Sequence, residues 1–259
     1  VHGALLPTDL ADLDAVVHLA GAGIGDHRWT DEYMRTVRES RVAGTALLAT
    51  AMASAAGAVD GAPSVLLSGS AVGVYGDMGD DAEPADEQAP AGTGFLADLC
   101  RDWEAATAPA AAAGIRVAHL RTGIVLSRSG GALGKMLPLF KLGVGGRFGN
   151  GRQWMSWISI DDQLGAIEHL IHGTLSGPVN LTAPNPVRNA EFAATIGRVL
   201  HRPAVLPVPA FGPKLLLGGE RAEALLFDGQ RVVPGALLAD GYRFRHADLE
   251  SALRSVLAR

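Results

Sequence analysis

Three hydroxyl side chains stand at positions where an α/β enzyme could place its reactive groups. The apolar run SVLLSGS (64–70) ends in Ser68 and Ser70, and Tyr75 follows five residues later. A hydroxyl at the top of a parallel strand can hydrogen-bond a substrate carbonyl or hydroxyl, and it can equally cap the next turn. The hydrolase elbow G-x-S-x-G is not met, because Ser68 stands two residues before Ser70 and Val72 two after. The pattern indicates hydrogen bonding or proton transfer rather than nucleophilic hydrolysis.

Small residues follow an earlier strand-like run. Ala20, Gly21 and Ala22 come at the end of AVVHLAG (15–21) and just after it. In a doubly wound sheet, ligands bind outside the carboxyl ends of the strands. Small side chains there let the backbone approach a ribose or a diphosphate closely, although a tight strand-to-helix turn explains them equally well.

The elements that would position these residues alternate along the chain. Apolar runs at 15–21, 64–70, 116–126 and 178–184 read as strands, and helical patterns fit 30–56, 94–113, 160–172 and 190–200. Fully apolar strands separated by helices are typical of a parallel sheet covered on both faces. We therefore expect an α/β fold with a doubly wound parallel sheet, in which the first three runs are adjacent central strands.

Composition narrows the function classes. The chain has 259 residues, 48% of them apolar, a formal charge of −5 and no basic cluster, so we expect a small-molecule substrate and no nucleic-acid partner. The single cysteine, Cys100, excludes an internal disulfide framework and is compatible with a reducing cytoplasm, which is the expected location. No run approaches the roughly 18 apolar residues of a membrane span. His169 and His172 have no third ligand nearby in the sequence, so no metal is predicted.

Several blocks in a fixed order carry a resemblance to a known family. They are VVHLAGAGIG, SRVAGTALL, LLSGSAVGVYG, FLADLCRDWEAA, VAHLRTGIVL with GGALGKMLP, SWISIDDQ, and GQRVVPGALLADGYRF. Together they span essentially the whole chain, which resembles the atypical short-chain dehydrogenase/reductase subgroup of sugar-nucleotide epimerase-like proteins. The resemblance implies a Rossmann domain over residues 1–184 and a small C-terminal lobe over 185–259 that covers the substrate cleft.

The resemblance also makes one difference informative. Members of the family begin with a strand and a glycine fingerprint that admits a pyrophosphate to a helix N-terminus. No such fingerprint precedes Val1. We therefore expect that the first βαβ unit, about 30 residues or more, is absent from this sequence, that the strand at 15–21 has an open edge, and that this fragment binds a dinucleotide poorly.

The usual catalytic pair is replaced. The family's Ser/Thr position matches Ser70, whereas alignment on Glu104 places Leu96 at the tyrosine and Cys100 at the lysine. Neither can exchange a proton as a phenol beside an ammonium does. Arg41 stands at the helix asparagine position, where its guanidinium could pair with a cofactor phosphate or ribose, or could simply be solvated.

The remaining cofactor contacts follow from the resemblance, and the substrate contacts are residues of loops that we expect to converge at the strand ends. The predicted cofactor contacts are Leu19, Ala20, Gly21, Arg41, Ser68, Gly69, Thr122, Gly123 and Val125. The predicted substrate contacts, beside Ser70 and Tyr75 as catalytic groups, are Lys135, Gln153, Trp154 and Trp157. Two tryptophans supply a flat apolar wall with polar handles, although Trp157 could equally belong to the core. Asp161 and Asp162 are expected to cap the helix that follows them.

Two functions fit these observations. One is an NAD(P)(H)-dependent oxidoreductase or epimerase acting on a small carbonyl, hydroxyl or nucleotide-sugar compound. The other is a catalytically depleted dinucleotide-binding sensor or scaffold, which the loss of the Tyr/Lys pair favours. The family resemblance favours NADP, and NAD is not excluded, because the stretch that normally decides between them is not in the chain. The oligomeric state is left open.

Overall fold

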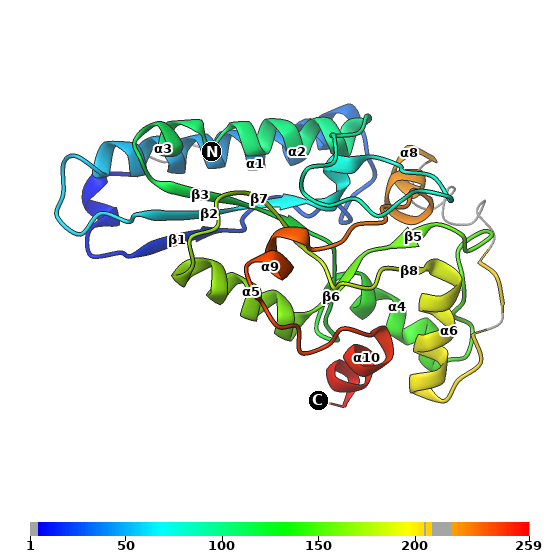
Figure 1. Ribbon diagram of the computed structural model, residues 1–259. Helices are drawn as coiled ribbons and strands as arrows, with labels where there is room; N and C mark the ends of the chain where they lie inside the picture. Colours follow the sequence, from blue (N-terminus) through cyan, green and yellow to red (C-terminus); the bar gives the residue numbers. More distant parts are fainter. Residues whose placement is uncertain (1–4, 205, 209–218, 259) are drawn as a thin grey trace.

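A parallel sheet forms the centre of the computed structural model, which describes residues 5–204, 206–208 and 219–258. Its four strands run in the order β1-β2-β3-β7 and all pair in parallel: β1 (Ala15–His18), β2 (Val65–Ala71), β3 (Arg116–Thr122) and β7 (Gly177–Leu181). Helices lie on both faces (Figure 1). The predicted α/β class is confirmed, and the first three predicted strands are adjacent, but β1 lies at the edge of the described sheet rather than at its centre.

Three helices cover one face of the sheet and one long helix lies against the other (Figure 1). The first group comprises α1 (Asp31–Ala55), α2 (Phe95–Ala105) and α3 (Ala108–Ala112), and the opposite helix is α5 (Ile160–His172). Alternation along β2 sends Leu66 toward the first group and Leu67 toward α5, and both are fully buried. Apolar strands buried on both sides are what a doubly wound sheet requires.

The predicted strand at 116–126 is divided. It breaks at Gly123, where an added Cβ would lie 2.6 Å from the Ser156 carbonyl oxygen, so only glycine permits this approach. Beyond the break, β4 (Ile124–Leu126) pairs in parallel with β6 (Trp157–Ser159) rather than with the main sheet. A further pair, β5 (Trp154–Met155) and β8 (Val187–Arg188), is antiparallel.

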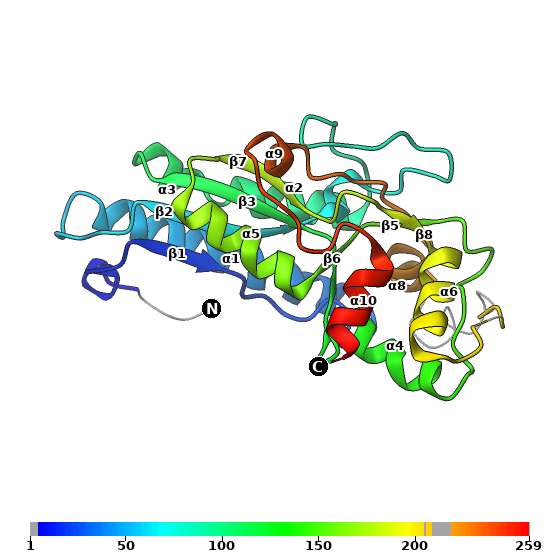
Figure 2. The ribbon, with the colours of Figure 1, turned by 60° about the horizontal axis from the view of Figure 1, so that its bottom comes forward.

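A second core lies beyond these short strands. The helices α4 (Gly131–Lys141), α6 (Asn189–Leu200) and α10 (Leu249–Leu257) enclose it together with β4 and β6 (Figure 2). Its buried side chains include Phe140, Trp157 and Phe192. This part of the molecule corresponds to much of the predicted C-terminal lobe, but it also takes in residues 124–159.

The C-terminal segment is not confined to that second core. After α8 (Gly219–Ala222) and a π-helical turn (Glu223–Phe227), the chain passes the loop after β2, where Val233 N donates to Ala85 O at 2.9 Å. It also reaches β7, where Asn180 Nδ2 donates to Val233 O at 3.0 Å. The short helix α9 (Gly235–Ala239) then packs on β7, with Leu237 fully buried. The sequence pattern also predicts a helix over 214–227, of which residues 214–218 lie outside the described ranges. Two 3-10 turns complete the fold, at Pro7–Leu10 and Val72–Tyr75.

β1 is the edge strand of the main sheet. Within the described ranges it pairs only with β2, and Val17 and Leu19 are 38% and 56% exposed (Figure 2). None of the helices in these ranges has the length and apolar content that a membrane span requires.

Candidate functional site

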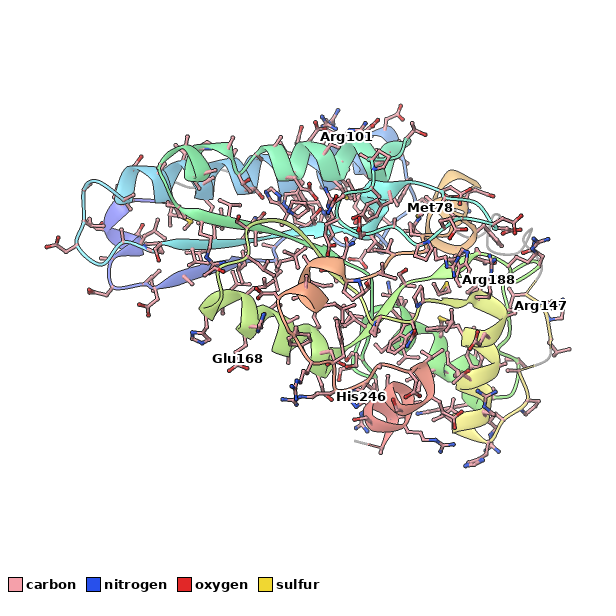
Figure 3. The ribbon with its side chains drawn as sticks, in the orientation of Figure 1. Met78, Arg101, Arg147, Glu168, Arg188 and His246 are labelled. Atoms are coloured by element: carbon pink, nitrogen blue, oxygen red, sulfur yellow. The ribbon has the colours of Figure 1, made fainter. Side chains whose placement is uncertain are left out.

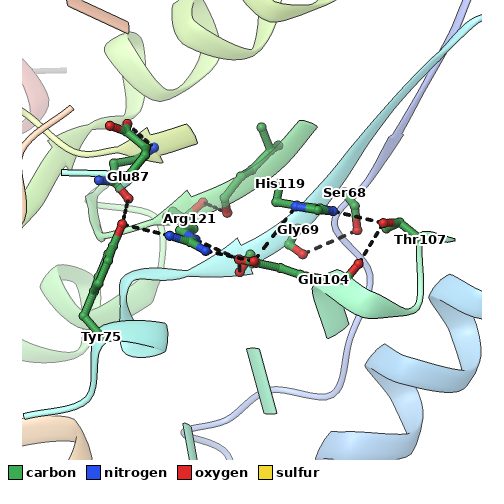
Figure 4. A network of polar contacts seen from close by, with 12 residues as sticks. Ser68, Gly69, Tyr75, Glu87, Glu104, Thr107, His119 and Arg121 are labelled. Atoms are coloured by element: carbon green, nitrogen blue, oxygen red, sulfur yellow. Dashed lines mark hydrogen bonds and ion pairs between the residues drawn. The ribbon is translucent and has the colours of Figure 1, made fainter. Parts of the chain in front are cut away.

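A buried polar network occupies the carboxyl end of β2, and Glu104 of α2 is at its centre (Figure 4). Arg121 of β3 donates to both carboxylate oxygens of Glu104, Nε to Oε1 and Nη2 to Oε2, at 2.9 Å each. Ser70 Oγ donates to Glu104 Oε1 at 2.7 Å. Although burial opposes it, these hydrogen bonds hold the pKa of Glu104 below its ordinary value. The pair is therefore a bidentate ion pair with the serine hydroxyl attached to it.

The network continues to Tyr75 through Arg121. Arg121 Nη1 donates to the Tyr75 hydroxyl at 3.0 Å, and that hydroxyl donates to Asn180 Oδ1 at 2.8 Å and lies 3.1 Å from the Asp86 carbonyl oxygen. Burial raises the pKa of Tyr75, against the effect of Arg121. Ser70 and Tyr75 are only 5% and 4% exposed. The structure thus brings the two predicted catalytic residues into one network, but their hydroxyls are already partnered inside the protein.

The loop after β1 forms a second region, held by Arg41 of α1. Arg41 Nη1 donates to Ala22 O at 2.9 Å and to Val37 O at 3.2 Å, and the guanidinium carbon lies 5.1 Å from the centroid of Trp103. An added Cβ at Gly21 would come within 3.1 Å of that guanidinium. Arg41 therefore fills the space that Gly21 leaves and fixes the loop; it is half-buried rather than simply solvated.

Lys135 reaches the same loop from α4. Its Nζ lies 3.3 Å from Gly25 O and 3.5 Å from Asp26 Oδ1. Leu19, Ala20 and Gly21 are exposed. Five predicted site residues from three elements therefore gather around the loop after β1, with two cations and an accessible backbone.

A pocket of about 350 Å³ opens beside α2, close to the end of β2. Its apolar wall is formed mainly by Trp29, Phe95 and Leu96, and its polar lining by Thr93, Glu223, Asp228 and Gln230; glycines 73, 76 and 94 and Ala224 complete it. Leu96 is the residue aligned with the usual catalytic tyrosine. The pocket therefore lies where the reacting part of a substrate is expected, although no residue predicted as a contact lines it.

The predicted substrate contacts lie elsewhere. Trp154 contacts two guanidinium groups, with Arg188 at 3.9 Å and Arg231 at 4.3 Å from its ring centroid, at the end of the molecule where Figure 3 labels Arg188. Gln153 is 5% exposed and its Nε2 donates to Leu226 O at 2.7 Å. Trp157 is fully buried in the second core, so its interpretation as a pocket wall is wrong and the core alternative holds.

Several predicted cofactor contacts are less accessible than the loop after β1. Ser68 is fully buried, and Gly69 lies under Trp103, whose ring an added Cβ would approach to 2.6 Å. Thr122, Gly123 and Val125 are half-buried, and Gly123 N already donates to Leu181 O. At Ser68 and Gly69, the structure therefore leaves no accessible surface for direct contact with a cofactor.

Asp162 has a different task from the predicted cap. Ser159 caps α5, its hydroxyl accepting from Asp162 N at 3.1 Å. The Asp162 carboxylate is fully buried and accepts from Arg245 N at 2.7 Å and from His246 N at 3.0 Å. It ties the C-terminal segment to α5, because a buried carboxylate needs such donors.

Sequence reasoning missed the polar side of the pocket. Gln230 belongs to the block GQRVVPGALL, and Asp228 directly precedes that block. Both are far from β2 in the sequence, and only the fold brings them close to Leu96. The partner of Ser70 had a signal, because Glu104 stands eight residues after Leu96 in the quoted helix block. Arg121 also gave a signal, because a charged side chain in an apolar strand is almost never buried without an oppositely charged partner.

Comparisons with known proteins agree with this architecture. The model of the NAD dependent epimerase/dehydratase family matches residues 6–180, and that of a domain of unknown function, DUF1731, matches residues 208–256. Epimerase family protein Mb2239 from Mycobacterium bovis is 46% identical over 252 residues, which are 97% of this chain and 81% of that protein. The chloroplastic SDR39U1 homolog of Arabidopsis thaliana is 39% identical over 244 residues, covering 94% of this chain and 68% of that protein.

A solved structure shows the same arrangement. Human epimerase family protein SDR39U1 (isoform 2), crystallised with NADPH, matches with a TM-score of 0.87 and 34% identity over 96% of this chain and 83% of that one. Fold and site together define an NAD(P)-binding protein of the atypical short-chain dehydrogenase/reductase class. Within that class, the chain belongs to the NAD dependent epimerase/dehydratase family and is epimerase-like, which confirms the resemblance in its sequence blocks.

Proposed function

We propose that this protein binds NADP(H) and transfers a hydride to or from a small carbonyl, hydroxyl or nucleotide-sugar compound held in the pocket beside Leu96. One observation carries the proposal: an accessible pocket lies at the carboxyl end of β2, against the helix position that bears the catalytic tyrosine in ordinary relatives. Ligands of doubly wound sheets bind at this end of the strands.

The residues after β1 fit one side of a dinucleotide. Ala20 and Gly21 are exposed and lack long side chains, and Arg41 and Lys135 bring positive charge to their loop. Exposed backbone beside guanidinium and ammonium groups suits ribose and phosphate oxygens. In the proposed complex, Ala20, Gly21 and Arg41 hold the cofactor, and Thr122 to Val125 pass its carboxamide side.

The choice of NADP over NAD rests on a relative. Human SDR39U1, which shares this fold and 34% of its aligned residues, was crystallised with NADPH. Arg41 and Lys135 add two cations near the loop. Two cations are better partners for the additional phosphate of NADP than for the free ribose hydroxyl of NAD. NADPH is therefore the first cofactor to test and NADH the comparison.

A bound nicotinamide dinucleotide would supply or accept the hydride, and the chain's residues would do the rest. Trp29, Phe95 and Leu96 would exclude water from the substrate. Ser70 Oγ donates its proton to Glu104, so its role toward a ligand would be that of an acceptor or a positioning group. Cys100 does not replace the missing lysine, because burial raises the pKa of its thiol to about 11 and leaves it neutral.

A catalytically depleted sensor or scaffold is the second candidate. One observation favours it: the predicted catalytic hydroxyls are buried. Ser70 and Tyr75 are both under 6% exposed, and both are hydrogen-bonded to other residues of the protein. In this alternative, cofactor binding at the loop after β1 is retained and the pocket beside Leu96 takes a ligand without turnover.

The test separates the two candidates on the full-length protein. NADPH and NADH are titrated against protein fluorescence, and carbonyl compounds and nucleotide sugars are then screened for cofactor oxidation or epimer formation. Hydride transfer predicts tighter binding of NADPH than of NADH and turnover of at least one class of compound. Binding without any turnover would leave the sensor alternative, and no binding of either dinucleotide would contradict both.

A further inference from the structure

We propose that Asp228 is the group that exchanges a proton with the substrate oxygen in the pocket beside Leu96. The inference rests on the proposed function and names the residue that takes over the task of the missing tyrosine. Asp228 lines the same pocket as Phe95 and Leu96 of α2, although it is far from the strand ends in the sequence.

The chain holds Asp228 in place through its neighbours. Gly229 N donates to Asp77 Oδ1 at 3.1 Å, Met78 N donates to Gly229 O at 3.0 Å, and Gln230 Nε2 donates to Gly76 O at 3.0 Å. These bonds fasten residues 228–230 to the turn that follows β2. Asp228 N also donates to Glu223 O at 2.8 Å, which closes the π-helical turn. The carboxyl therefore sits on a fixed backbone at the wall of the pocket.

The surroundings favour the protonated form of this carboxyl. Burial raises the pKa of Asp228, and the nearby carboxylates of Asp77 and Glu223 raise it further. Asp77 accepts two backbone N–H groups, from Gly79 and Gly229, which hold its carboxylate at this turn. No ion pair or hydrogen bond joins the Asp228 side chain to another residue in the described part of the chain. The carboxyl group thus has no protein partner there and lines the pocket, where a ligand can exchange a proton with it.

The proton balance of the reaction is complete with this group. In the reducing direction, the substrate carbonyl carbon gains a hydride from the reduced nicotinamide dinucleotide, and the carbonyl oxygen takes the proton of the Asp228 carboxyl. A hydroxyl, the oxidised dinucleotide and the Asp228 carboxylate result, and water at the pocket mouth returns the proton. Oxidation of a hydroxyl runs the same steps in reverse, with the carboxylate as base.

The first test measures the carboxyl itself. NMR of isotope-labelled aspartate carboxyl carbons, assigned with Asp228→Asn, should show Asp228 titrating above the ordinary value of about 3.9. Asp77→Asn keeps an oxygen for the Gly79 and Gly229 N–H groups and removes one negative charge, so it should lower the pKa of Asp228. An Asp228 carboxyl that titrates at the ordinary value, or that does not respond to Asp77→Asn, overturns the inference whatever the activity.

The second test measures turnover. With NADPH and the uncharged probe para-nitrobenzaldehyde, or the best compound of the screen, Asp228→Asn should lower kcat by about 10²- to 10⁴-fold, the usual contribution of a general acid. The NADPH Kd should stay within about twofold, a difference below 0.5 kcal/mol. Asp81→Asn is the matched control, because Asp81 is 92% exposed on the loop after Asp77 and should leave kcat unchanged.

The two proposals fail in different ways. Wild-type protein that does not bind NADPH overturns the proposed function, and the inference falls with it. Wild-type protein that binds NADPH and turns over, with Asp228→Asn equally active across the pH range, overturns the inference alone. If NADPH binds but no compound is turned over, the sensor alternative holds, and the inference about Asp228 falls with hydride transfer.

Discussion

Two polar regions at the carboxyl end of β2 differ in whether their polar groups have hydrogen-bonding partners inside the protein. In the network around Glu104, the charges of Arg121 and Glu104 meet in a bidentate pair, and Ser70 and Tyr75 give their hydrogen bonds to protein partners. In the pocket beside Leu96, Asp228 faces an open volume and two other carboxylates. A partnered network fixes geometry, whereas a group with unused hydrogen-bonding capacity can act on a ligand.

The largest expected effect comes from breaking the network. Glu104→Met leaves the Arg121 guanidinium buried without its counter-ion and should cost about 3–5 kcal/mol of unfolding free energy. The double variant Glu104→Met/Arg121→Met removes both charges and should recover a large part of that loss. Urea unfolding measures both. A single variant as stable as wild type would contradict the structural role given to this pair.

The next effect concerns cofactor binding at the loop after β1, where Arg41 is the residue to change. A charge-assisted hydrogen bond contributes about 1.5–3 kcal/mol, so Arg41→Ala should weaken NADP(H) binding by roughly 10- to 150-fold in the full-length protein. Arg35→Ala is the control, because Arg35 lies on the same helix and is 65% exposed. Arg41 also holds the loop after β1, so folding is checked by circular dichroism. Unchanged affinity in a folded Arg41→Ala protein would leave Arg41 as a loop-fixing residue only.

Ser70 should show a smaller, mixed effect. Ser70→Ala removes one hydrogen bond to the Glu104 carboxylate and should cost about 1.5–3 kcal/mol of stability at most. Turnover should fall more than NADPH affinity does, because Ser70 lies toward the reacting end rather than the loop after β1. Kinetics and fluorescence titration at matched temperature separate these quantities. Loss of NADPH affinity with unchanged kcat would reverse the assignment.

The two regions should respond to pH with opposite signs. The folded pKa of Glu104 is lowered, so the unfolded state binds more protons and stability is lost as pH falls from about 4.3 through the folded value. The folded pKa of Asp228 is raised, so stability is lost as pH rises from about 3.9 through its folded value. Urea unfolding across the acidic range, compared among wild type, Glu104→Gln and Asp228→Asn, measures both. Parallel slopes in the two variants would contradict the contrast.

Local patterns were sufficient for the main elements. Helix α5 begins and ends at the predicted residues, 160 and 172, because its period, its N-terminal acids and its C-terminal histidines all agree. The sequence predicts one strand over 116–126, because nothing in it reveals that Gly123 must pass the Ser156 carbonyl. Close backbone approach is a tertiary fact that composition does not encode.

The sequence predicts site residues only where they stand close to a recognisable strand or family block. Gly21 is predicted from its place after a strand and Arg41 from the family resemblance of the block SRVAGTALL, and the structure places them in contact. Trp154 and Trp157 were chosen by residue type, but stacking on Arg188 and burial in the second core decide their roles. Asp228 could not be found, because its neighbours across the pocket come from residues 29–96 and meet it only in the fold.

Filling the pocket tests the central claim most directly. Leu96→Trp enlarges one wall, and Ala224→Trp enlarges another part of the lining, so that a folding defect in one variant does not decide the result. NADPH binding and turnover are measured in both, with Leu142→Trp, a 76% exposed position outside the pocket, as control. If the pocket is the reaction site, both pocket variants keep NADPH affinity within about threefold and lose turnover, while the control keeps both. Full turnover in folded pocket variants would contradict the account.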